Sequence, residues 1–256
     1  MTGQNTKGTI MQNPVQKKFH IANILVIICG LIALVCYDLF GNFGTPVLKG
    51  RTSFWFVLLG CINLVYAVKN RITGILPVYF ISAGLAVGMI ADVLLAVDFA
   101  KGVIFFAIGH ILYLAGFYMI ERPHLLDLIL STPVSAISIF VVGGTPFINV
   151  PDPVLEKGLM VYAVIISFMA GKSVSNFSMD RTRARLMIAA SSVLFLLSDV
   201  SLMAYMFYSP LRLFWVLCIY VYWPAQLLLA WALLHYAEEN KRQRVHINTI
   251  RVNYKI

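Results

Sequence analysis

The chain has 256 residues, of which 60% are hydrophobic and 12% are charged, and its mean hydropathy is +0.83. Soluble domains carry about 25% charged residues, so the composition excludes a water-soluble enzyme and predicts an all-α membrane protein. The net charge of +9 does not indicate a nucleic-acid partner, because the basic residues flank apolar segments. The four cysteines lie within apolar segments without zinc-site spacing, so we expect neither a metal nor another cofactor.

Eight apolar stretches are long enough to cross a bilayer, whose hydrocarbon core takes about 20 helical residues. They run over residues 21–40, 54–68, 72–97, 102–120, 125–142, 154–171, 184–208 and 211–234. The second is short, and we expect it to include the preceding "RTS". The predicted organisation is a polar cytoplasmic N-terminal segment (1–20), an eight-helix transmembrane domain (21–235) and a basic cytoplasmic tail (236–256).

The basic residues predict how the chain is oriented. Eight spans put both termini on the same side, and that side carries fifteen Lys and Arg residues against five on the other. Lys and Arg are enriched in cytoplasmic loops, so we predict a multi-pass membrane protein with both termini in the cytoplasm. This topology suits a bacterial inner membrane and the endoplasmic reticulum equally. The cations on the opposite side are Lys49, Arg51, Lys101, Lys157 and Arg212.

Two spans carry an aspartate among apolar residues: Asp92 in "IADVLLA" and Asp199 in "FLLSDVSL". An ionised carboxylate near the bilayer centre costs about 2.5–3.5 kcal/mol on insertion scales, so such a residue is a functional candidate by default. The alternative is a protonated side chain that hydrogen-bonds to a neighbouring helix. At 1.5 Å per residue, Asp92 lies about 9 Å and Asp199 about 13 Å below the non-cytoplasmic ends of their spans. Both carboxyl groups are therefore predicted to occupy one layer of the membrane.

The same layer contains a histidine. His110, in "FFAIGHILY", lies about 12 Å from that surface and is a candidate to orient an aspartate or move a proton. A plain hydrogen-bonded histidine is the alternative. Tyr113, which follows on the same helical face, and Tyr162, Tyr222 and Gln226 in later spans are candidate substrate-binding residues. Packing or hydrogen bonding is the simpler interpretation of these four.

Burial and mutual repulsion favour one protonated and one ionised group in a carboxyl pair, which is the arrangement that acid-assisted hydrolysis needs. Asp38 and Asp98 close their spans, and we expect loop or helix-cap roles for them. The remaining acidic residues are expected to be solvated or interfacial. They are Glu121, Asp127, Asp152, Glu156, Asp180, Glu238 and Glu239.

The segments around the two aspartates resemble each other. Each has an apolar run, a small residue, Asp-Val, further apolar residues, a short loop and a returning span. Because four spans separate the aspartates, their helices point the same way. The pattern therefore predicts a weak parallel internal repeat.

Five segments, "GMIADVLLA", "FFAIGHILYLAGF", "VYAVIISFMAG", "LFLLSDVSL" and "YVYWPAQLLLA", resemble in this order the YhhN-like lysoplasmalogenase family. The resemblance covers about residues 70–235. It implies an eight-span hydrolase that cleaves the vinyl ether of lysoplasmalogens to a fatty aldehyde and glycerophosphoethanolamine or glycerophosphocholine. It also implies a lysophospholipid substrate within the membrane and a paired role for Asp92 and Asp199.

Two other functions use acidic residues inside a membrane. A proton-coupled transporter of a small or lipid-like substrate explains buried acids and a parallel repeat, and it is the main alternative. An intramembrane aspartyl protease also uses two aspartates, but its GxGD context is missing here, where the contexts are "IAD" and "LSD". Hydrolysis remains the preferred prediction.

Overall fold

The computed structural model describes residues 14–40, 45–146 and 148–253. Within these residues the chain forms eight helices and no strand, which confirms the predicted all-α class. The helices are α1 (Pro14–Phe40), α2 (Pro46–Lys69), α3 (Leu76–Leu95), α4 (Phe99–Ile120), α5 (Leu125–Gly144), α6 (Pro153–Met179), α7 (Arg183–Phe207) and α8 (Arg212–Asn253). Each is long and apolar enough to cross a membrane.

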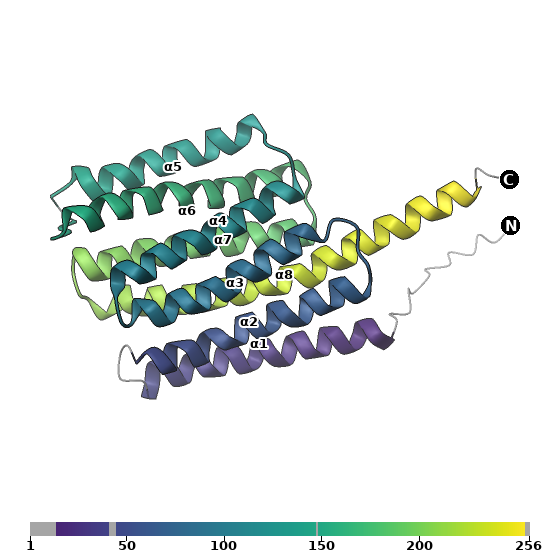
Figure 1. Cartoon of the computed structure of the whole chain (residues 1–256), viewed down its shortest axis with the longest axis horizontal. Coiled ribbons are helices and arrows are strands. Elements are labelled where there is room, and N and C mark those ends of the chain that lie inside the picture. Colours follow the sequence, from purple (N-terminus) through teal and green to yellow (C-terminus); the bar gives the residue numbers. More distant parts are fainter. Residues whose placement is uncertain (1–13, 41–44, 147, 254–256) are drawn as a thin grey trace, which may run out of the picture.

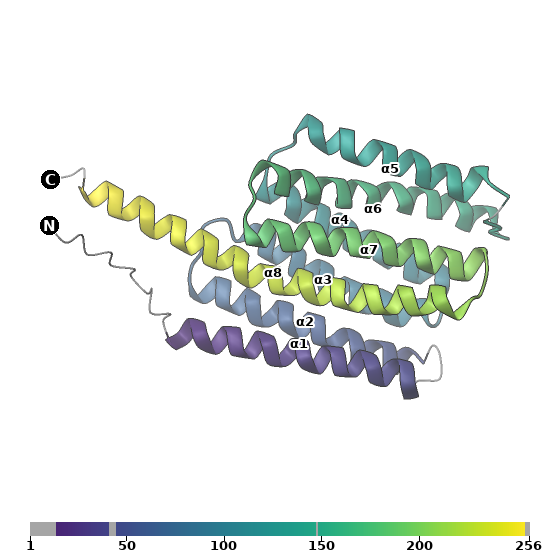
Figure 2. The same ribbon diagram turned by 180° about the vertical axis from the view of Figure 1, so that it is seen from behind.

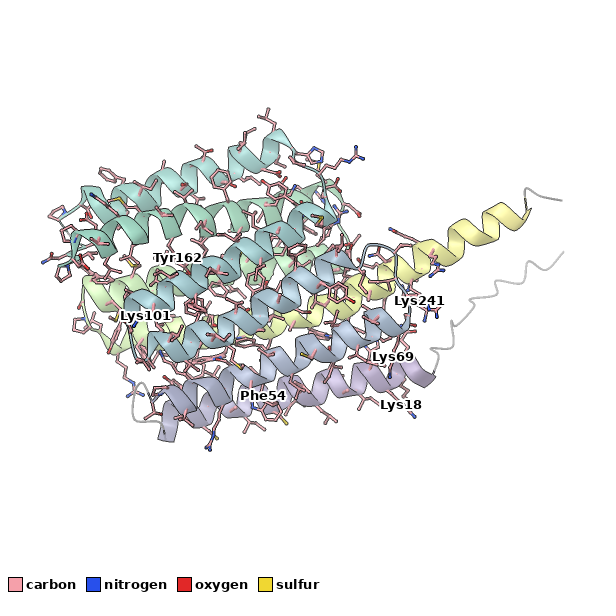
Figure 3. The ribbon with its side chains drawn as sticks, in the orientation of Figure 1. Lys18, Phe54, Lys69, Lys101, Tyr162 and Lys241 are labelled. Carbon is pink, nitrogen blue, oxygen red and sulfur yellow. The ribbon has the colours of Figure 1, made fainter. Side chains whose placement is uncertain are left out.

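The helices run alternately in opposite directions, so α1 begins and α8 ends at the same end of the bundle (Figures 1 and 2). We call this the terminal end and the opposite one the distal end. Lys18, Lys69 and Lys241 lie at the terminal end, whereas Lys101 lies at the distal end (Figure 3). Both ends of the described chain thus lie on one side, and the cytoplasmic location of that side stays a prediction.

Helix α8 is central to the packing. It contacts α7, α2, α1 and α3, while α3 packs on α4 and α5 packs on α6. Helices α1 and α5 lie at opposite edges of the bundle (Figure 1). The largest buried cluster of apolar side chains is built mainly from α2, α3, α4, α7 and α8, and these five helices also surround the site described below.

Local sequence explains where several helices begin. Proline stands in the first turn of α2, α3 and α6, where its fixed φ suits the helix and its missing N–H is not needed. The Asp98 carboxylate caps α4 by accepting from the Lys101 amide at 3.1 Å. Asp152 caps α6 in the same way by accepting from the Val154 amide at 2.9 Å. The cap role predicted for Asp98 is therefore confirmed.

Four helices extend well beyond their predicted spans: α1 begins at Pro14 rather than at residue 21, α6 ends at Met179 rather than at residue 171, and α2 and α8 are the other two. Helix α2 begins at Pro46, ahead of both residue 54 and the expected "RTS" extension, so Lys49, expected to precede the second span, lies in its first turn. Helix α8 continues unbroken to Asn253 and projects from the terminal end (Figure 1), so the expected domain boundary at 235 falls inside a helix. A search that uses hydropathy alone misses these polar extensions, because Lys and Arg lower the mean hydropathy although they are good helix formers. Residues 1–13 of the expected N-terminal segment lie outside the described residues.

Two acidic residues that were expected to be solvated or interfacial are buried within the bundle, so they are not solvated side chains. Asp127, in α5, is 2% exposed and accepts a hydrogen bond at 3.0 Å from Lys172, which is 0% exposed on α6. Glu238, in α8, is 6% exposed and hydrogen-bonds to Gln16 at 2.8 Å and His20 at 2.7 Å on α1. Each pairing joins two different helices, α5 with the next helix α6 and α8 with the first helix α1, because a buried charge requires a partner.

Asp127→Asn is expected to lower the free energy of unfolding by about 3–5 kcal/mol, because it leaves the Lys172 ammonium buried without its carboxylate. Thermal unfolding of the purified protein in detergent measures the change as a drop in Tm. Asp98→Asn is the matched control, since Asp98 pairs with an exposed Lys101, and its Tm should stay at the wild-type value. Equal Tm values for the two variants would contradict the assignment.

Close packing of α3 on α4 depends on a glycine. A Cβ placed on Gly84 would lie 2.4 Å from the Tyr113 ring and 3.0 Å from the Gly109 carbonyl oxygen. Real side chains do not approach this closely, so any larger residue has to move Tyr113 or separate the two helices. Glycine is used here because it lets two backbones approach.

Gly84→Ala is expected to destabilise the protein by about 1–3 kcal/mol, the usual effect of overpacking a tight contact. Gly158→Ala provides the control, because a Cβ at Gly158 meets nothing within 4 Å and alanine is the better helix former by about 0.5–1 kcal/mol. The Tm should therefore fall in the first variant and hold or rise in the second. A Gly84→Ala protein as stable as the wild type would show that the contact is loose.

Candidate active site

Asp92 on α3 and Asp199 on α7 line one small cavity near the distal end of the bundle. Its volume is about 40 Å³, room for roughly one water molecule. The structure thus brings together two carboxyl groups that the sequence placed in the same membrane layer. Apolar and aromatic side chains form much of the remaining wall: Leu95, Phe106, Leu202, Trp215, Ile219 and Trp223.

Asp92 is held by hydroxyl groups from two other helices. It is 4% exposed, and its Oδ2 accepts from the Ser53 hydroxyl of α2 at 2.5 Å and from the Tyr222 hydroxyl of α8 at 2.7 Å. The Trp223 indole N–H donates in turn to Ser53 at 3.3 Å. These contacts fix the side chain toward the cavity, and donors of this kind stabilise a carboxylate.

Asp199 has a different environment. It is less deeply buried than Asp92 and accepts a hydrogen bond from the Tyr162 hydroxyl of α6. Among the described residues no second side chain donates to it, and no Lys, Arg or His forms an ion pair with it. The two carboxyl groups of the cavity are therefore unequal: Asp92 has two donors and Asp199 has one.

The four tyrosine and glutamine candidates mostly lie behind the cavity wall. Tyr222 lines the cavity, whereas Tyr113, Tyr162 and Gln226 do not. Tyr113 donates to Gln226 at 2.9 Å, and the Gln226 amide donates to the Tyr222 hydroxyl at 3.4 Å. A hydrogen-bonded chain thus runs from α4 to Asp92. These residues position the carboxyl groups, and direct contact with a substrate stays a prediction for Tyr113, Tyr162 and Gln226.

His110 does not lie on the cavity wall. It is 1% exposed and its ring centroid lies 4.5 Å from that of Phe195, 5.4 Å from Tyr162 and 6.0 Å from Tyr113. Within the described residues neither ring nitrogen bonds to another side chain, and the nearby polar group is the Phe106 backbone carbonyl one turn earlier on α4. His110 therefore forms no hydrogen bond with either carboxyl group. Its link to the site is its packing against Tyr162, which donates to Asp199.

Comparison with known proteins places the chain in a family. A model of the YhhN family matches residues 53–233, a stretch that covers more than half of the chain and includes Asp92, Asp199 and His110. The chain belongs to the YhhN family. This confirms the resemblance seen in the sequence. No curated protein and no solved structure matches the chain.

One residue of the cavity lies outside the YhhN match and was missed as a site residue by sequence reasoning. Lys49 is 7% exposed and lines the cavity together with Asp92 and Asp199. Ser53, which donates to Asp92, follows four residues later and so shares a face of α2 with Lys49. The four-residue spacing between Lys49 and Ser53 could have identified both as site residues, but only if α2 had been expected to begin as early as Pro46.

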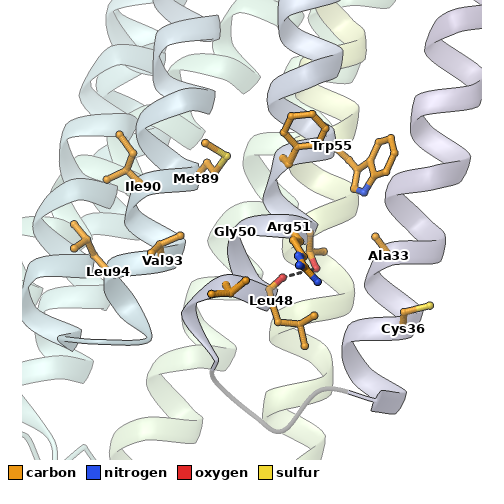
Figure 4. A pocket seen from close by; sticks show the side chains of 13 residues that line it. Ala33, Cys36, Leu48, Gly50, Arg51, Trp55, Met89, Ile90, Val93 and Leu94 are labelled. Carbon is orange, nitrogen blue, oxygen red and sulfur yellow. Dashed lines mark hydrogen bonds between the residues drawn. The ribbon is translucent and has the colours of Figure 1, made fainter.

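A larger hollow borders a different face of α2 in this YhhN-family protein. It is an apolar groove of about 830 Å³ between α1, α2 and α3, lined by side chains such as Trp55, Met89 and Val93, with Arg51 beside them (Figure 4). Neither Asp92 nor Asp199 lines it. Size alone would favour the groove as the functional site. However, the groups able to exchange protons with a substrate line the smaller cavity.

Proposed function

We propose that this YhhN-family protein hydrolyses the vinyl ether bond of lysoplasmalogens within the membrane. The observation that carries the proposal is that Asp92 and Asp199, from helices distant in sequence, line one cavity with space for water. The resemblance noted in the sequence supports this substrate class. Paired carboxyl groups supply the acid and the base that cleavage of such an ether requires, as they do in glycosidases.

The unequal surroundings assign a role to each carboxyl group. Asp92 accepts from two hydroxyl groups, and such donors favour the ionised form. Asp199 has a single donor, Tyr162, and a second charge in the same small cavity is unfavourable. Asp199 is therefore the general acid and Asp92 the carboxylate that stabilises positive charge and activates water.

The reaction then balances with one water molecule. Asp199 gives its proton to the alkene carbon remote from the ether oxygen, which leaves an oxocarbenium ion beside the Asp92 carboxylate. Water adds to the cationic carbon and loses a proton to Asp92, which yields a hemiacetal. The hemiacetal carbon–oxygen bond to glycerol breaks as Asp92 gives the proton that it gained to the glycerol oxygen. The hemiacetal hydroxyl group loses its proton to Asp199, which releases the aldehyde and restores both carboxyl groups. The described residues contain no group of three His, Cys, Asp or Glu side chains suited to a metal ion, and the expectation that no metal takes part stays a prediction.

Asp92→Asn and Asp199→Asn should each reduce aldehyde release by about 10²–10⁴-fold, the usual contribution of a general acid or base. The measurement is aldehyde formation from a panel of lysoplasmalogens by the purified protein in detergent, where no sealed compartment exists and transport cannot contribute. Asp98→Asn carries the same substitution outside the cavity and should keep wild-type activity. Each variant should also elute and unfold like the wild type.

Deuterated water identifies the chemistry itself. Carbon protonation by Asp199 requires that the released aldehyde carry one deuterium on the carbon next to its carbonyl group, which mass spectrometry detects after reduction to the alcohol. Full activity in either asparagine variant would refute the pairing. A wild-type protein that releases no aldehyde from any lysoplasmalogen would refute the proposed activity.

His110→Phe is expected to keep activity within about tenfold of the wild type, far above the loss for a general acid or base. His110 packs among aromatic rings and makes no hydrogen bond to another side chain within the described residues, so phenylalanine preserves its contacts. Removal of two buried nitrogens that bond to no other side chain should also hold or raise the Tm. The same aldehyde assay, with a Tm for each variant, tests this. A 10²-fold loss without a change in Tm would instead show that His110 transfers protons.

A further inference from the structure

Lys49 is a buried cation that forms no ion pair within the described chain. It is 7% exposed in the first turn of α2 and lines the cavity with Asp92 and Asp199. Within the described residues its ammonium group forms no hydrogen bond and no ion pair, and the centroid of the Trp215 ring lies 5.7 Å from Nζ. Asp92 lines the same cavity, where its Oδ2 accepts from Ser53 and Tyr222.

The level of Lys49 in the bundle is informative. Lys49 precedes Ser53, the donor to Asp92, by four residues, so its Cα lies about 6 Å nearer the distal end. Helical side chains lean toward the N-terminus of their helix, which for α2 is again the distal end. Moving outward along the bundle, one therefore meets the carboxyl pair first and the ammonium group second. The N-terminus of α2 adds a further partial positive charge beside Lys49.

This order matches the order of groups in a lysophospholipid. The glycerol backbone separates the ether oxygen from the phosphate by three carbons, and the charged phosphate lies nearer the membrane surface than the ether. A substrate whose vinyl ether is held between Asp92 and Asp199 thus brings its phosphate toward the level of Lys49. A buried ammonium group is stabilised by such an anion through a charge-assisted hydrogen bond.

We propose that Lys49 binds the phosphate of the substrate and makes the enzyme selective for phosphorylated alkenyl glycerols over neutral ones. This inference rests on the proposed vinyl ether hydrolysis. Lys49 precedes the residues matched by the YhhN model, so it is a feature of this chain beyond the matched family segment.

Lys49→Met tests the proposal with two substrates, a 1-alkenyl lysophospholipid and the corresponding 1-alkenylglycerol without phosphate. We expect kcat/KM to fall about ten- to hundredfold on the phospholipid, the loss of one charge-assisted hydrogen bond, and to change less than about twofold on the alkenylglycerol. Lys49→Arg, which keeps the charge, should retain most of the activity. Lys101→Met, an exposed lysine at the same end of the bundle, should match the wild type on both substrates.

Other outcomes overturn the proposal. Equal losses on both substrates would show that Lys49 acts on the carboxyl pair, and unchanged kinetics on both would show a structural role. Lys49→Gln serves in the same assay if the methionine variant unfolds.

A binding assay keeps the inference separate from the catalytic proposal. Tryptophan fluorescence, sensitive to Trp215 and Trp223 on the cavity wall, reports binding of a non-hydrolysable 1-alkyl lysophospholipid and of the matching 1-alkylglycerol. The wild type should prefer the phosphorylated lipid at least about tenfold, and Lys49→Met should lose that preference. A wild type that binds with this preference but releases no aldehyde would refute hydrolysis alone. A preference that survives in Lys49→Met would refute the role of Lys49 alone.

Discussion

Polar groups buried between apolar helices must find partners on other helices, and this requirement determines how the bundle is assembled. Lipid tails offer no hydrogen bonds, so an unpaired group inside the bundle is costly. Asn23 and Asn63 form reciprocal hydrogen bonds of 2.8 Å, and Asn63 also donates to the Ala230 carbonyl, which joins α1, α2 and α8. The peripheral helix α5 is joined to α6 by the buried Asp127–Lys172 pair. Asp92 joins α3 to α2 and α8 in the same way.

The two aspartates share a position but not an environment. Both lie near the distal ends of parallel helices, α3 and α7, and each of these helices packs closely on the next, α4 and α8. The parallel direction follows from the four spans between the aspartates, and the weak parallel repeat stays a prediction. The hydrogen-bond donors of the two aspartates do not follow such a repeat. Asp92 accepts from residues on α2 and α8, whereas Asp199 accepts from a residue on α6. A pair with identical surroundings would give no basis for different roles, whereas the unequal donors of Asp92 and Asp199 support the different roles proposed for them.

Sequence reasoning predicted those features that depend on composition along one helix. The eight spans, the all-α class and the layer that holds Asp92 and Asp199 all follow from hydropathy and a rise of 1.5 Å per residue. It failed where a charge is satisfied by a side chain on another helix: Asp127 looks solvated or interfacial until Lys172 is seen beside it. Lys49 was missed as a site residue because the second span was expected to begin after it, at residue 51 or 54, whereas α2 begins at Pro46. His110 lies at the predicted depth, but depth along a helix does not say which face meets the cavity.

The small size of the cavity is consistent with the chemistry proposed for it. An oxocarbenium ion is short-lived in water. A site with room for roughly one water molecule holds the water that reacts and excludes other water. Phe106, Tyr222 and Trp223 wall the cavity beside the carboxyl groups, and aromatic faces stabilise positive charge when water is excluded. The Asp92 carboxylate adds a fixed negative charge that needs no reorganisation as the cation forms. In the proposed reaction a lipid has to displace part of this wall to bring its ether between the aspartates, so the contacts that α8 makes with α3 and α7 have to open before a proton can be transferred.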